Sequence, residues 1–167
     1  MKKKLKLVIG CDHAAPDMKA AVADDLRKKG YEVTDVGVFS TESCDYPDVA
    51  HLLCLELQNQ RADLGILICG TGIGMSIAAN KHHGIRAACC SDLYSAEMTR
   101  RHNDANVLCL GARVVNLETA LRLVDTFITT DFEGGRHQKR VDKLAEIEAS
   151  EAKKYNAAFS QARAKEE

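Results

Sequence analysis

The sequence contains no tryptophan, only two prolines and no long apolar run. A membrane-spanning helix needs ~20 consecutive apolar residues, so no membrane span is predicted. Charge of one sign is not in excess either, because 23 lysines and arginines stand against 24 aspartates and glutamates. A general nucleic-acid binder needs a basic surplus. We therefore expect neither nucleic acid nor a membrane as a partner.

The sequence also lacks a recognisable secretion signal and the spacings typical of a metal site. The basic start at residues 1–4 precedes an apolar run that is too short for a signal peptide. The seven cysteines are an odd number, and neither C-x-x-C nor H-x-x-x-H spacing occurs. We expect a cytoplasmic protein in a reducing compartment, no metal site, and cysteines that serve mostly as small hydrophobic residues. His51, His82 and His83 are interpreted as helix-surface or turn residues.

The composition is ordinary for a globular protein, with 46% hydrophobic and 28% charged residues in a chain of 167. Apolar runs alternate with helical patterns along the chain. Strands are predicted at 5–9, 31–36, 64–69, 85–90 and 107–110, and helices at 16–30, 49–57, 74–80, 94–102 and 117–128. This order predicts an α/β protein with a three-layer αβα, Rossmann-like fold and a five-stranded parallel sheet. Ligands of such sheets bind at the carboxyl ends of the strands.

The last thirty residues have a different pattern. Apolar residues recur mainly at threes and fours from Val141 to Ala162, and charges fill the remaining positions. This spacing predicts a long amphipathic C-terminal helix. We expect a domain at residues 1–148 and a helical extension at residues 149–167. The stripe is too extended for a compact core, which favours packing on a partner subunit.

The strongest local signal is the segment from Cys69 to Gly74, where three alternating glycines join an apolar strand to a helix. Such glycines let backbone N–H groups converge into a cradle for an anion. A tight turn without a ligand is the plainer alternative. A dinucleotide site is also open, because Asp92 lies 20 positions after Gly72, although the G-x-G-x-x-G fingerprint is missing. No Gly-Lys-Ser/Thr closes the loop, which excludes a Walker P-loop.

Several side chains could supply chemistry next to this cradle. A thiol at the position of Cys69 favours the thiolate, which can act as a nucleophile or as a base toward carbon. Asp12 and His13 end the first strand, so they share a sheet edge with Cys69. Arg136 and Arg140 are four apart, as expected for a phosphate-binding helix face, although a solvated basic face is equally plausible. Considered alone, His102 reads as a surface residue at a helix end.

Six motifs together resemble one enzyme family, that of type B ribose-5-phosphate isomerases, which also holds allose-6-phosphate and galactose-6-phosphate isomerases. The resemblance covers about residues 5–148. Its motifs are Gly-Cys-Asp-His at 10–13, Asp-Tyr-Pro at 45–47, Ile-Cys-Gly-Thr-Gly-Ile-Gly at 68–74, Ile-Ala-Ala-Asn-Lys at 77–81, Arg-His-Asn-Asp at 101–104 and Gly-Gly-Arg-His-Gln at 134–138.

The resemblance implies interconversion of an aldose phosphate and a ketose phosphate without metal or cofactor. It implies that Cys69 moves the proton between C2 and C1, with Thr71 assisting, and that Asp12 and His102 open the sugar ring, His102 as the acid. Some relatives use a glutamate near the end of the loop, but Met75 and Ser76 stand there. The implied substrate-binding residues are Asp12, His13, Tyr46, Gly70, Thr71, Gly72, Ile73, Gly74, Asn103, Arg113, Arg136 and Arg140.

The resemblance also implies a homodimer, or a tetramer built from it, with the active site shared between subunits. His102, Asn103 and the two C-terminal arginines would then reach the neighbouring subunit's site. The expected reaction is conversion of D-ribose 5-phosphate to D-ribulose 5-phosphate through a cis-enediolate. Allose 6-phosphate or galactose 6-phosphate as substrate remains an alternative. Two further alternatives are a non-catalytic nucleotide-binding module and an inert dimer subunit.

Overall fold

The fold is that of a computed structural model, which describes the backbone of residues 5–163 and the side chains of residues 5–156. The chain divides into two compact units, residues 1–132 and residues 133–167. The described part of the chain contains no helix that combines the length and the apolar character needed to cross a membrane.

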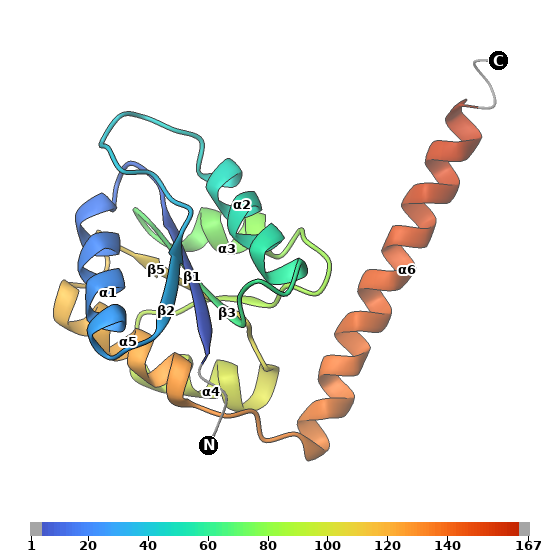
Figure 1. The fold of residues 1–167 in the computed structure, drawn as a ribbon. Helices are drawn as coiled ribbons and strands as arrows, with labels where there is room; N and C mark the ends of the chain where they lie inside the picture. The colour runs from blue at the N-terminus through green and yellow to red at the C-terminus, as the bar shows by residue number, and fades with distance from the viewer. Residues whose placement is uncertain (1–4, 164–167) are drawn as a thin grey trace. The chain divides into compact units, whose positions relative to one another are not determined.

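The first unit is built on a five-stranded sheet in the order β2-β1-β3-β5-β4 (Figure 1). Every neighbouring pair is parallel, as predicted. The strands are β1 (Lys6–Cys11), β2 (Glu32–Asp35), β3 (Leu64–Cys69), β4 (Ala87–Cys89) and β5 (Val107–Gly111). All six residues of β3 are buried, which explains why this strand reads as an unbroken apolar run.

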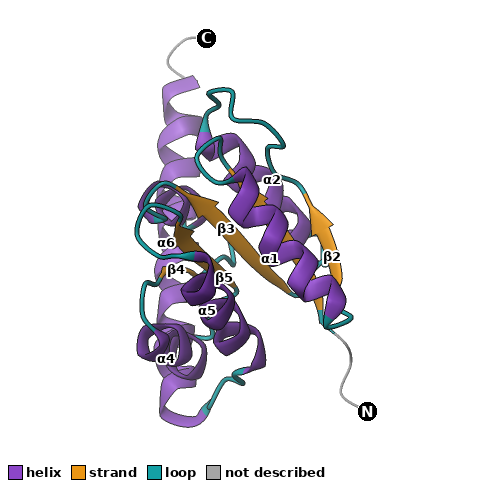
Figure 2. Cartoon of the chain, turned by 90° about the vertical axis from the view of Figure 1, so that its left-hand side faces the viewer, coloured by secondary structure: helices purple, strands orange, loops and turns teal. Residues whose placement is uncertain are grey.

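Helices cover both faces of the sheet, so the predicted three-layer αβα fold is confirmed. One face packs on α1 (Pro16–Lys28), α4 (Leu93–Asn103) and α5 (Leu117–Thr129), and the other on α2 (Tyr46–Gln58) and α3 (Ile73–Ala79). Figure 2 looks onto the first face, with α1 and α5 in front of the strands. Each layer has its own apolar cluster, with Phe127 in the first and Met75 in the second.

One buried side chain in α1 does not follow from the apolar spacing. Val22 and Leu26 are buried as predicted, but so is Lys19, whose side chain is only 2% exposed. Its Nζ lies 2.7 Å from Asp35 Oδ1 and 3.8 Å from the centre of the Phe39 ring. Asp35 Oδ1 also accepts the Gly37 N–H at 3.0 Å. A buried cation requires such partners, and together they tie α1 to the segment after β2.

The second unit contains the short 3-10 helix η1 (Gly135–His137) and the long helix α6 (Gln138–Arg163). Gly134, just before η1, and Gly135, its first residue, both have positive φ, at 65° and 57°. Glycine adopts this conformation readily because it has no side chain. The predicted C-terminal helix is therefore confirmed. Leu144, Ile147 and Tyr155 of its apolar stripe are exposed. The stripe's members Phe159 and Ala162 lie outside the residues whose side chains are described.

Candidate active site

The candidate site lies at the switch point of the sheet, where the chain order reverses between the adjacent strands β1 and β3. Cys11 at the end of β1 is in register with Ile68 of β3. The next residue, Asp12, donates its backbone N–H to the Ile68 carbonyl at 3.1 Å. This register places Asp12 beside Cys69, as predicted from the strand ends.

The thiol of Cys69 is held by the glycine loop. Cys69 is only 5% exposed, and its Sγ accepts the N–H of Gly72 at 3.1 Å. Gly72 precedes the first turn of α3 with a φ of 79°. The Gly72 N–H thus fixes the position of the sulfur against the loop.

Two large side chains pack directly on the loop glycines. A Cβ on Gly70 would lie 3.5 Å from Nη1 of Arg113, whose own backbone N–H donates to the Gly70 carbonyl at 3.0 Å. A Cβ on Gly74 would lie 2.8 Å from Cζ of Tyr46. The loop therefore has a guanidinium at its start and an aromatic ring at its end. Both contacts join segments far apart in sequence, so no local pattern could reveal them.

The loop is also seated against β5. A Cβ on Gly111 would come within 2.7 Å of the carbonyl carbon of Thr71. This close approach requires glycine and was not among the sequence-based predictions. Thr71 itself is exposed, and its Oγ1 accepts the N–H of Ile73 at 3.4 Å. The Thr71 hydroxyl is thus at the open side of the loop.

Asp12 and His13 are oriented by backbone groups. Asp12 is 7% exposed, and its Oδ1 accepts the Ala14 N–H at 2.9 Å. Nδ1 of His13 accepts the Cys44 N–H at 3.3 Å. An acceptor nitrogen carries no proton, so a neutral His13 carries its proton on Nε2, where it can donate to an anion.

Four other cysteines are buried and unsuited to chemistry. Burial raises the pKa of Cys11 and of Cys54 to about 12, that of Cys90 to about 11, and that of Cys109 well above its usual value. These thiols stay protonated at neutral pH and act as small hydrophobic residues, as predicted. Cys89 is the last residue of β4 and is exposed, whereas Cys90 follows the strand and is buried in the first apolar cluster.

His102 and Asn103 lie at the other edge of the sheet. They end α4, four to five positions before β5 begins. The Asn103 carbonyl accepts Nε of Arg86, which directly precedes β4, at 3.0 Å. These two residues thus lie near the amino ends of the strands, whereas Cys69 lies at the carboxyl end of β3. Within one chain, the structure does not bring them together.

Arg136 and Arg140 belong to the second unit. They were expected on one helix face, but Arg136 lies in η1 and only Arg140 in α6, because the positive-φ glycines tighten the turn before the long helix. Nε of Arg136 donates to Nε2 of His137 at 3.2 Å, and the same nitrogen of His137 lies 3.5 Å from Glu133.

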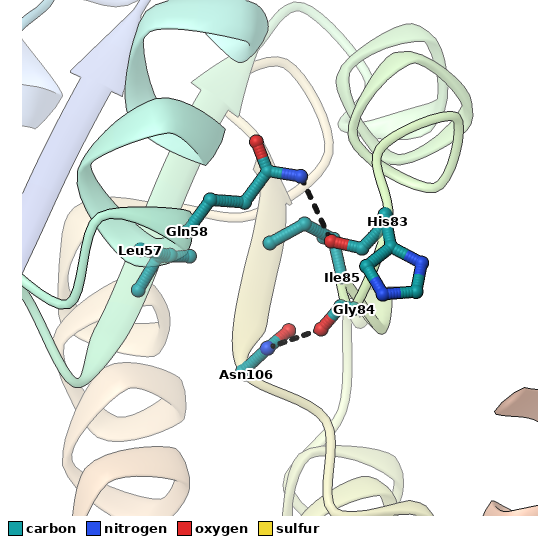
Figure 3. Close-up of a pocket in the computed structure, with 6 residues that line it drawn as sticks. All are labelled: Leu57, Gln58, His83, Gly84, Ile85 and Asn106. Atoms are coloured by element: carbon teal, nitrogen blue, oxygen red, sulfur yellow. Dashed lines mark hydrogen bonds between the residues drawn. The ribbon is translucent and has the colours of Figure 1, made fainter.

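Two other places could have held a ligand. Asp92, which kept a dinucleotide site open, caps α4 by accepting the Ser95 N–H at 2.8 Å and the Ser95 hydroxyl at 2.7 Å. A cavity of about 340 Å³ lies at the amino edge of the sheet, where Gln58 donates to the His83 carbonyl and Asn106 to the Gly84 carbonyl (Figure 3). Backbone groups therefore already engage its side-chain amides.

A parallel sheet between two layers of helices, with a thiol, a carboxylate and a glycine loop at its switch point, defines a Rossmann-like α/β protein. The sequence profile of the Ribose/Galactose Isomerase family matches residues 7–144. The chain belongs to this family.

Relatives agree in sequence and in structure. Ribose-5-phosphate isomerase B of Escherichia coli is 49% identical over 143 residues, covering 86% of this chain and 96% of that protein. D-erythrulose-4-phosphate isomerase of Pectobacterium atrosepticum is 45% identical, covering 88% and 97%. The structure of ribose-5-phosphate isomerase B from Mycoplasma genitalium with bound ribulose 5-phosphate matches with a TM-score of 0.83 and 40% identity, covering 86% and 96%.

Proposed function

We propose that this chain is an aldose-ketose isomerase that interconverts D-ribose 5-phosphate and D-ribulose 5-phosphate. The observation that carries the proposal is the Cys69 thiol, which accepts the Gly72 N–H at 3.1 Å beside Asp12. Family membership and the ribulose 5-phosphate held by the Mycoplasma genitalium relative give further support. Aldose and ketose are isomers, so the reaction needs no oxidant or reductant.

In this mechanism Cys69 is the base. The thiolate removes the proton from C2 of the open-chain aldose, and the electron pair moves through C1 to the carbonyl oxygen. The resulting cis-enediolate carries its charge on oxygen, and the amides of residues 70–74 form an oxyanion hole for it. The hydroxyl proton on the C2 oxygen moves to the C1 oxygen. The thiol then returns its proton to C1, the C2 oxygen becomes the ketone, and the C1 oxygen becomes a hydroxyl. Thr71 assists at the open side of the loop.

The remaining residues bind the substrate and open its ring. Asp12 and His102 transfer the protons of ring opening, with His102 as the acid. The phosphate is held by His13, Arg113, Arg136 and Arg140, because guanidinium groups and an imidazole N–H donate to phosphate oxygens. Asn103 binds sugar hydroxyls, and Tyr46 lines the pocket over Gly74.

A homodimer completes this site. His102 and Asn103 lie at the sheet edge opposite Cys69, so a second chain is needed to bring an acid to the thiol. In a symmetric dimer each chain then contributes its loop to one site and its α4 end to the other.

The protein is proposed to function in a reducing cytoplasm. All seven cysteines are free thiols, which supports this proposal.

Mixed dimers test the shared site. Cys69→Ala and His102→Asn are each expected to be nearly inactive alone. Random mixing after joint refolding puts one intact site into half of the dimers, so the mixture should recover about one quarter of wild-type activity. A mixture of Cys69→Ala with Cys69→Ser, which damages the same group in both chains, is the matched control and should stay inactive. Absence of recovery in the first mixture would place the whole site in one chain.

The activity itself is tested by ketose formation in buffer that contains a chelator. Rapid conversion of D-ribose 5-phosphate is expected, because the oxyanion hole consists of backbone amides. Allose 6-phosphate and galactose 6-phosphate are measured alongside, and erythrulose 4-phosphate, which is itself a ketose, is followed by formation of the aldose. Activity on one of these alone would keep the mechanism and change the substrate. A lack of activity on all of them would overturn the proposal. It would favour the nucleotide-binding module if an ATP analogue binds, and the inert dimer subunit if none does.

The C-terminal part of the chain is proposed to be an extension beyond the catalytic domain. The Escherichia coli and Mycoplasma genitalium relatives are each covered over 96% of their length by only 86% of this chain. The catalytic domain would therefore comprise residues 1–148, and residues 149–167 would be the extension, whose described part belongs to α6 as far as Arg163 and would pack on a partner subunit.

A further inference from the structure

Two histidines that lie 31 positions apart meet on the surface of the first unit. Nδ1 of His51, on α2, lies 2.7 Å from Nε2 of His82, in the turn after α3. Their ring centres are 5.0 Å apart. The sequence gives no metal-binding spacing here, because the two residues belong to different elements.

Hydrogen bonding determines which nitrogen of His82 carries the proton. Nδ1 of His82 lies 3.1 Å from the carbonyl oxygen of Ala78, which can only accept. This nitrogen is therefore protonated, and Nε2 of a neutral His82 presents its lone pair to His51. His51 donates its own Nδ1 proton into that lone pair.

We propose that His51 and His82 form a binding site for a divalent transition-metal ion of the zinc, nickel or copper type, in which the ion replaces the proton between the two rings. Neutral imidazole is the preferred ligand of these ions. A backbone carbonyl that accepts the other N–H is the usual support of a metal-bound histidine, because it fixes the tautomer and the ring orientation. His82 already has that support.

Only a small movement separates the present geometry from coordination. Two Zn–N bonds of ~2.1 Å in tetrahedral geometry place the nitrogens about 3.4 Å apart, so the two nitrogens must move about 0.7 Å further apart than the present 2.7 Å. His51 is exposed, which leaves its ring free to turn and lets its proton move to Nε2. Water would occupy the remaining positions around the ion.

The ion would join two elements that border the catalytic loop. His51 lies on α2, the helix that begins with Tyr46, and His82 follows α3, the helix that begins after Gly72. Binding to the folded state alone stabilises that state. The melting temperature should rise by about 5–10 °C at a nickel concentration about one hundred times Kd.

Nickel titration of the chelator-treated full chain tests the site, with isothermal calorimetry and thermal unfolding as readouts. Nickel is chosen because, unlike copper(II), it is not reduced by thiols, and because it favours imidazole. His51→Gln and His82→Gln should each weaken nickel binding by more than about 100-fold. Loss of a residue that only supports a ligand costs up to about 100-fold in metal affinity, and these variants remove a ligand itself. His83→Gln is the matched control, because it removes the adjacent imidazole and leaves the pair intact.

The comparison among these variants decides the proposal. A nickel site and a thermal shift that vanish in both variants of the pair and persist in His83→Gln support it. Equal binding by wild type and His51→Gln, or loss in His83→Gln as well, would overturn it. The readouts do not involve isomerase activity, so this result is independent of the proposed reaction. Melting temperatures measured in chelator show whether each variant is folded.

Discussion

Cys69→Ala should lower kcat by about 10²- to 10⁴-fold, because the substitution removes the group proposed to take the proton from C2. The affinity for ribulose 5-phosphate should stay near that of the wild type, since the residues proposed to bind the phosphate are unchanged. Calorimetry with the inactive variant measures this affinity directly. A kcat that falls without a loss of binding identifies a group that acts in the transition state alone.

Cys89→Ala is the control for the loss of a thiol near the loop. Cys89 is exposed as a residue, but its Sγ lies 3.5 Å from the Thr71 carbonyl, and desolvation of this sulfur raises the pKa of the thiol, so we assign it no chemistry. This variant should retain most of its activity. Substantial turnover by Cys69→Ala would show that another group is the base.

Gly72→Ala should both destabilise the fold and lower activity. Gly72 has a φ of 79°, and a Cβ there would lie 2.8 Å from Sγ of Cys89 and 3.0 Å from the backbone carbon of Leu110. The left-handed conformation costs a residue with a side chain about 1–2 kcal/mol, and the overpacking about 1–3 kcal/mol more. Urea denaturation measures the free energy of unfolding, and kcat reports the displaced N–H that binds Cys69.

Gly84→Ala separates these two causes. Gly84 has a similar φ of 74°, but nothing lies within 4 Å of a Cβ built on it. It should show the conformational cost of about 1–2 kcal/mol alone and keep its activity. Combining Gly72→Ala with Cys89→Ala should restore part of the lost stability, because the contact with sulfur is removed while that with Leu110 remains. Equal losses in Gly72→Ala and Gly84→Ala would contradict the packing argument.

Hydrophobic spacing predicts the layers of this fold because each layer is buried by a regular pattern. The strand at residues 64–69 agrees residue for residue, since burial on both faces leaves no polar position in it. The strand predicted at 85–90 is shorter, at Ala87–Cys89. The backbone N–H of Arg86 donates to the side-chain oxygen of Asn106 at 2.8 Å, although the Arg86 carbonyl still accepts backbone N–H groups. An edge strand has fewer backbone partners, so its ends depend on such local contacts.

The candidate site is only partly accessible to the same reasoning. The ends of β1 and β3 can be placed together because parallel strands share an edge, which brings Asp12 to Cys69. The positions of Tyr46 over Gly74 and of Arg113 over Gly70 depend on packing between distant segments. The burial of Lys19 could not be predicted from the sequence either, because its partner Asp35 lies on another element.

The separation of His102 from Cys69 across the sheet has a consequence for how activity depends on protein concentration. A lone chain would hold the thiol and the acid at opposite ends of its strands, so it would fold without being able to turn over its substrate. Association follows mass action, and the fraction of paired chains falls on dilution. For the proposed homodimer, specific activity should therefore decline below its dissociation constant, and the first few chains made in a cell would stay inactive until they pair.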